Sequence, residues 1–75
     1  MNNDQNHKTQ LQTELIQAAK IADIETMYTL TKQGADIYEL DETGKSACNY
    51  LRLQDLNKAI TLLGRVMRDI YDKKE

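Results

Sequence analysis

Few residues in this chain of 75 have side chains suited to catalysis or to reactive chemistry. His7 is the only histidine, and it stands in the polar segment "MNNDQNHK", where we expect it to be solvated. Cys48 is the only cysteine, and no basic residue adjoins it. A small core residue is therefore favoured over a reactive thiol at that position. A single cysteine also allows no internal disulfide, which fits a reducing compartment.

Three carboxylates, Asp36, Asp41 and Glu42, lie close together in the sequence and raise the question of a cation site. Their spacing does not match that of a calcium-binding loop. The chain has no glycine-rich phosphate loop and no acid–base pair on one predicted face. We therefore predict no catalytic residue, no metal, no cofactor and no enzymatic activity.

The composition predicts one small soluble domain, because 40% of the residues are hydrophobic and 29% are charged. A net charge of −2 favours neither nucleic acid nor an acidic membrane surface, and the cations of 65–74 are interleaved with acids. The polar residues 1–10 predict no conventional secretory signal peptide, and no apolar run approaches the roughly 20 residues that span a bilayer. We predict a cytoplasmic protein that binds neither nucleic acid nor membrane, with export by a signal-less system left open.

Apolar periodicity and capping residues predict an all-α chain with four helices, at about 10–21, 24–32, 46–53 and 55–72. Asp23, Ser46 and Asp55 are expected to cap the second, third and fourth helices. Gly34 is expected to end the second helix, and 41–44 has the composition of a tight turn. We expect a flexible segment at 1–9 and a single helical domain at 10–75.

The residue pattern of the first two predicted helices recurs 33 residues later. Leu15 aligns with Cys48 (48 − 15 = 33), and Leu30 aligns with Leu63 (63 − 30 = 33). The segment 34–36 reads "GAD", a "D-x-x-G" turn follows at 41–44, and 46–49 reads "SACN". Over residues 12–63 the chain resembles ankyrin repeats, whose Thr-Pro-Leu-His motif would fall on 46–49. The resemblance covers about two repeats, and the second is degenerate because Ala47 and Asn49 replace the proline and histidine.

The resemblance implies a short ankyrin-type stack of two helix–turn–helix repeats with a long C-terminal helix. It also implies a non-enzymatic module that binds another protein through the hairpin tip and the inner helices. The positions carried over at the tip are Tyr38, Leu40, Glu42, Thr43 and Lys45, and those on the inner helices are Gln12, Lys20, Ile21, Leu53 and Gln54.

Two alternatives stay open at these positions. Tyr38 and Leu40 either form an exposed anchor pair or pack back onto the third helix. Ile21 and Leu53 either form a small apolar strip or pack between the repeats.

The last helix carries a second pattern, because Leu56, Ile60, Leu63, Met67 and Ile70 are spaced 4, 3, 4, 3 like a two-heptad seam. The seam either packs against the second and third helices or meets another chain. Repeat proteins usually need about three repeats, so something must cover an open end here.

The residues assigned to self-association are Leu63, Val66, Met67, Ile70 and Tyr71. Two alternative functions follow: a small homodimeric structural protein, and an inhibitor or immunity-like protein. In the second, acidic residues at 39–42 would meet a basic cleft.

Overall fold

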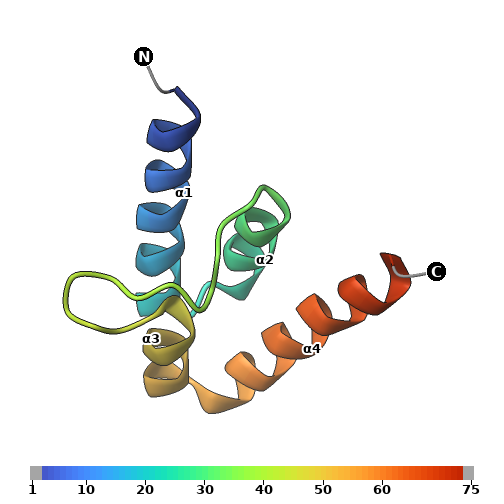
Figure 1. Cartoon of the computed structure of the whole chain (residues 1–75). Helices are drawn as coiled ribbons and strands as arrows, with labels where there is room; N and C mark the ends of the chain where they lie inside the picture. Colours follow the sequence, from blue (N-terminus) through green and yellow to red (C-terminus); the bar gives the residue numbers. More distant parts are fainter. Residues whose placement is uncertain (1–2, 74–75) are drawn as a thin grey trace.

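A computed structural model describes the backbone of residues 3–73 and the side chains of residues 9–69. Within that range the chain forms four helices and no strand: α1 (Asn3–Lys20), α2 (Ile24–Lys32), α3 (Ala47–Gln54) and α4 (Leu56–Lys73) (Figure 1). The predicted all-α class is confirmed, and the last three helices begin and end within one residue of the predicted bounds.

The capping predictions explain this agreement. The Asp23 carboxylate accepts a hydrogen bond from the Thr26 amide at 3.3 Å, and the Asp55 carboxylate accepts one from the Lys58 amide at 3.2 Å. Ser46 and Asn49 form a reciprocal capping box at the start of α3. Each cap satisfies an amide that the helix itself leaves without a partner, and this fixes where the helix begins.

Helix α1 begins at Asn3, earlier than the predicted start near residue 10. The apolar spacing begins only at Leu11, so periodicity carries no signal for the turns before it. Residues 3–9 contain no proline or glycine, and a helix continues past its packed face until a residue breaks it. Residues 1–2 and the side chain of His7 lie outside the described part of the chain.

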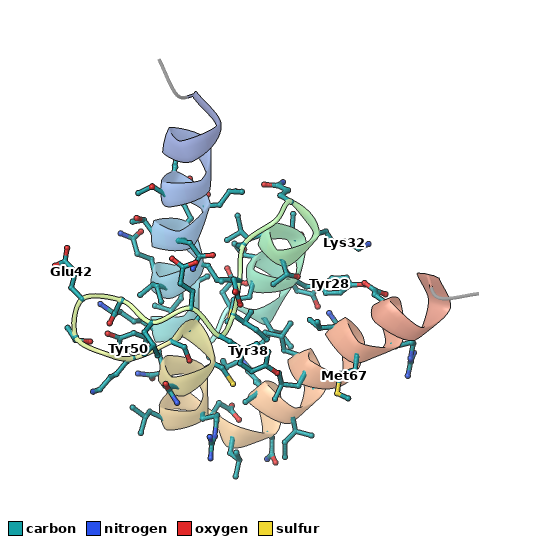
Figure 2. All side chains as sticks on the ribbon, viewed as in Figure 1. Tyr28, Lys32, Tyr38, Glu42, Tyr50 and Met67 are labelled. Atoms are coloured by element: carbon teal, nitrogen blue, oxygen red, sulfur yellow. The ribbon has the colours of Figure 1, made fainter. Side chains whose placement is uncertain are left out.

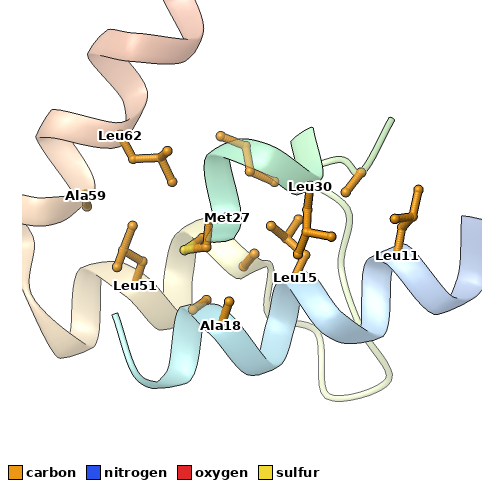
Figure 3. Packing of buried hydrophobic residues seen from close by; sticks show 12 residues of the cluster. Leu11, Leu15, Ala18, Met27, Leu30, Leu51, Ala59 and Leu62 are labelled. Carbon is orange, nitrogen blue, oxygen red and sulfur yellow. The ribbon is translucent and has the colours of Figure 1, made fainter. Parts of the chain in front are cut away.

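The four helices are arranged as two pairs placed side by side. α1 contacts α2 and α3, and α4 contacts α3 and α2. Within residues 3–73 the backbones of α1 and α4 are not in contact with each other, and neither are those of α2 and α3. The core between the pairs is centred on four fully buried side chains, those of Leu15, Met27, Leu51 and Leu62 (Figure 3).

Between α2 and α4 burial repeats at 32 residues, whereas between α1 and α3 the expected register of 33 still pairs two buried residues, Leu15 and Cys48. Leu30 and Leu62 are both buried (62 − 30 = 32), and so are Met27 and Ala59 (59 − 27 = 32). Leu63, the residue aligned with Leu30 at a spacing of 33, is only half-buried. The two capping aspartates, Asp23 and Asp55, obey the same spacing of 32.

The connections inside the two pairs differ. Residues 21–23 join α1 to α2, whereas Asp55 alone joins α3 to α4. Ala22 adopts a φ of +57°, a left-handed conformation that costs a non-glycine residue roughly 1–2 kcal/mol. Asp55 has an extended φ of −162°, so the second connection needs no such residue.

A hairpin-like segment, residues 35–46, joins the pairs and swings out to one side (Figure 1). Gly34 (φ +117°) ends α2, and Gly44 (φ +84°) lies in the predicted 41–44 turn. The Asp41 amide donates to the Lys45 carbonyl at 2.8 Å, which closes the segment. Ile37 is buried and anchors the segment, whereas Leu40 is exposed.

Candidate binding surface

A concave surface lies between α1 and residues 39–43 of the hairpin segment. We call it the α1–hairpin surface. Its lining residues come from three elements: Gln12, Thr13, Ile16, Gln17 and Lys20 from α1; Glu39, Leu40, Asp41, Glu42 and Thr43 from the hairpin; and Tyr50 from α3. The surface therefore depends on how the hairpin is held against the first and third helices.

One face of α1 forms the wall of this surface. Gln12, Ile16 and Lys20 follow one another at intervals of four residues, so they project from the same side of the helix. The Gln12 amide group donates to the Asp36 carbonyl at 3.1 Å and accepts from the Asp36 amide. This double contact ties the start of the hairpin segment to the middle of α1.

Asp41 organises the rim of the surface. Its carboxylate accepts hydrogen bonds from the Thr43 amide (2.9 Å), the Lys45 amide (3.1 Å) and the Tyr50 hydroxyl (2.6 Å). The Tyr50 hydrogen bond, followed by the Thr43 hydroxyl, holds the pKa of the Asp41 carboxyl well below its usual range. Asp41 therefore stays ionised, and its bonds link the rim to α3.

The Tyr50 ring connects the rim to two cations (Figure 2). The Lys20 ammonium lies 5.1 Å from the ring centroid and the Lys45 ammonium lies 5.8 Å from it. Both distances are within the range of cation–π attraction. Helix α1, the hairpin and α3 thus meet at one aromatic side chain.

Leu40 is the apolar side chain exposed on this surface, with 62% of its area open to solvent. Tyr38 is 64% exposed but does not line the surface. Of the two alternatives for this pair, packing back onto the third helix is therefore wrong. Glu39 and Glu42 flank Leu40 and are exposed, so the rim presents an apolar side chain among carboxylates.

The structure brings together some of the predicted contact residues and separates others. Leu40, Glu42 and Thr43 share the α1–hairpin surface with Lys20 and Gln12. Tyr38, Ile21 and Gln54 are exposed but lie outside its lining. Lys45 and Leu53 line a different groove, with Asn49, Arg52 and Leu56. Ile21 and Leu53 are both exposed, so neither packs between the helix pairs.

Ile16 and Tyr50 line the surface but were not predicted to do so. Ile16 lies four residues after Gln12 and four before Lys20, so helical spacing could have placed it on the same face. Tyr50 was expected only as a candidate for burial, and it is half-buried. Its contact with Asp41 joins residues nine apart across a loop, which no local pattern predicts.

No family model, curated protein or solved structure significantly matches this chain. The α1–hairpin surface must therefore be interpreted from its own residues.

The face of α4 assigned to self-association is partly exposed. Leu56 (56%), Ile60 (61%) and Met67 (55%) are open to solvent, while Leu63 and Val66 are half-buried. The predicted side chains of Ile70 and Tyr71 lie outside the described residues. Of the described seam residues, Leu56, Ile60 and Met67 are thus left open and Leu63 packs against the core, where α4 buries Ala59 and Leu62.

Polar contacts also join α4 to α2. The Tyr28 hydroxyl donates to the Asp69 carboxylate, and Arg65 pairs with Glu25 at 3.1 Å. The Lys32 ammonium lies 4.8 Å from the Tyr28 ring centroid, and the Arg65 guanidinium lies 5.7 Å from it. Tyr28 thus links α2 to α4, as Tyr50 links the hairpin to α3 (Figure 2).

Cys48, the one cysteine, does not line the α1–hairpin surface. Cys48 is buried, and its amide donates to the Ile37 carbonyl. Within the described residues no three His, Cys, Asp or Glu side chains are placed to hold a metal ion. In the same part of the chain no helix has the length and apolar character to cross a bilayer.

Proposed function

We propose that this chain is a non-enzymatic protein-binding module of the ankyrin-repeat type, which captures a partner protein on the α1–hairpin surface. Two observations support the repeat assignment: two helix pairs with one pattern of burial, and a capped third helix after a hairpin segment. The observation that carries the binding assignment is Leu40, an exposed leucine held at the edge of a concave surface.

The charges around Leu40 indicate the kind of partner. Residues 9–46 carry seven carboxylates and three cationic side chains. Glu39 and Glu42 stand on the rim beside Leu40, and Asp41 stays ionised between them. An acidic rim around an apolar side chain favours a basic partner surface that offers an apolar contact. The inhibitor or immunity-like hypothesis is one form of this function.

Affinity capture from the native lysate tests the proposal. The tagged chain should enrich a partner protein, and Leu40→Ala should lower that enrichment by roughly fivefold or more, since a buried anchor contributes over about 1 kcal/mol. Gln33→Ala is the matched control, because Gln33 is exposed at the end of α2 and outside the surface. Added salt should weaken the complex. Equal capture by wild type and Leu40→Ala would contradict the assignment.

Self-association through α4 stays the alternative. The exposure of Leu56, Ile60 and Met67 leaves an apolar strip that a second copy would cover. Light scattering on a sizing column distinguishes the two: a helical monomer at tens of micromolar contradicts self-association as the main role, and a stable dimer supports it.

A further inference from the structure

The end of the molecule formed by α3 and α4 is open, and the repeat in burial identifies what kind of element would cover it. On α2, Tyr28 is half-buried and its hydroxyl donates to Asp69 of α4, whereas Glu25 pairs with Arg65 of α4 but stays exposed. The residue 32 positions after Tyr28 is Ile60, which is exposed. The position on α4 that corresponds to the helix-contacting Tyr28 of α2 is therefore uncovered. By this correspondence its natural occupant is a helix.

A groove runs from α3 onto the start of α4, toward this position. We call it the open-end groove; its lining is Lys45, Asn49, Arg52, Leu53 and Leu56. Its lining includes two exposed leucines, and one helical turn beyond Leu56 lies Ile60, which is 61% exposed. Leu53, Leu56 and Ile60 thus form a run of exposed apolar side chains from the end of α3 onto α4.

The charges of the open-end groove have one sign. Its lining contains two cations, Lys45 and Arg52, and no carboxylate. Residues 47–69 carry four cationic side chains and two carboxylates, the reverse of the balance in residues 9–46. Both of those carboxylates have partners within the described chain: Asp55 caps α4 and Asp69 accepts from Tyr28. This end of an otherwise acidic molecule is therefore basic.

We propose that the open-end groove binds an amphipathic helix of another protein, with acidic residues flanking its apolar face. The apolar face would cover Leu53, Leu56 and Ile60, and the acidic flank would meet Arg52 and Lys45. The two surfaces share no lining residue, although the Lys45 ammonium also lies 5.8 Å from the Tyr50 ring, so the open-end groove is a second site that does not depend on the proposed function.

A second copy of the chain fits the groove less well. A two-fold arrangement would pair the groove with itself, so Lys45 and Arg52 would find no carboxylate in the lining of the other copy. A head-to-tail arrangement would present the far side of α2, where Thr26, Thr29 and Gln33 are exposed and polar, to an apolar groove. A membrane surface is also disfavoured, because the groove is concave and a bilayer offers no ridge to fill it.

Two designed peptides test the proposal on the isotope-labelled full chain by NMR titration. They share one leucine face at helical spacing, and differ only in having glutamates or lysines on its flanks. The glutamate peptide should bind at least about tenfold more tightly than the lysine peptide. It should shift the amide signals of Leu53, Leu56 and Ile60 and leave that of Leu40 in place.

Variants then separate the charge from the apolar contact. Arg52→Glu should abolish the preference between the two peptides, because Lys45 would then be balanced by a carboxylate in the groove lining. Lys58→Glu, the same charge change at an exposed residue outside the groove lining, should preserve the preference. Ile60→Ala should weaken binding of the glutamate peptide. Because Ile60 is exposed, this substitution should leave the fold intact.

Four results would overturn the proposal: equal affinity for the two peptides, no binding of either, shifts that map to another surface, or an unchanged preference in Arg52→Glu. Light scattering that shows a dimer whose Leu56 and Ile60 signals change on dilution would assign the groove to a second copy. Displacement of the glutamate peptide by vesicles of phosphatidylcholine and phosphatidylserine would assign it to a membrane.

Discussion

Asp41 is the residue on which the shape of the hairpin segment depends. Its carboxylate accepts from two backbone amides and from the Tyr50 hydroxyl, and so it fixes the turn and links that turn to α3. Sequence alone predicted the turn, because aspartate and glycine stand at its ends. It did not predict the link to Tyr50, since that contact requires the hairpin to fold back over the start of α3.

Replacing Asp41 should destabilise the chain in a pH-dependent way. The pKa of the Asp41 carboxyl is lowered in the folded state, so its contribution to stability is present above about pH 4 and is lost as the pH falls further. In urea denaturation, Asp41→Asn should lower the midpoint at neutral pH, and the gap from wild type should close in acid. Glu42→Gln is the control and should follow wild type. Parallel curves for wild type and Asp41→Asn would refute this role.

The Tyr28 hydroxyl should lose its proton at a higher pH than an ordinary tyrosine hydroxyl. Its pKa is raised above the usual value, first by the hydrogen bond to Asp69, then by burial and by the charge of Asp69. Since the neutral phenol is the bonded form, its contribution to stability is present below about pH 10 and is lost as the pH rises beyond that value. NMR of isotope-labelled tyrosine should show a lower Tyr28 pKa in Asp69→Asn than in wild type. An unchanged or higher pKa would show that this contact does not form.

At the scale of elements, the helices were predictable where a local signal marks their ends. Asp23, Ser46 and Asp55 each cap a helix, and Gly34 ends one. The start of α1 was not predictable, because its first turns carry no apolar spacing. The inward face of α4 was also missed. Its apolar residues cover half of the helix circumference, and only the contact with α2 selects which part of that arc is buried.

The register of α4 gives a direct test by substitution. Leu62 is fully buried and Leu63 half-buried, so Leu62→Ala should cost about 2–5 kcal/mol in the free energy of unfolding. Leu63→Ala should cost about 1 kcal/mol. Urea denaturation followed by circular dichroism measures both. If Leu62→Ala does not fold, Leu62→Val against Leu63→Val provides the comparison. A larger loss at Leu63 would restore the register of 33.

At the scale of the whole molecule, two similar helix pairs differ in charge and in what covers them. The first pair together with the hairpin that carries Leu40 is acidic, whereas the second pair is basic and leaves Leu56 and Ile60 open. The sequence implied two repeats and an end that something must cover, and it left open whether the hairpin tip is exposed. It did not predict that Leu53 and Lys45 would belong to a separate groove, because that division follows from how the hairpin lies against α1.

The most direct test of the binding assignment is photo-crosslinking in the cells that make the protein. A photoreactive amino acid is placed at position 40, inside the α1–hairpin surface, and in a second variant at position 33, outside it. We predict a discrete adduct with one partner protein from position 40 and none of that adduct from position 33. Adducts of equal yield from the two positions, or none from position 40, would contradict the claim that this surface captures a partner.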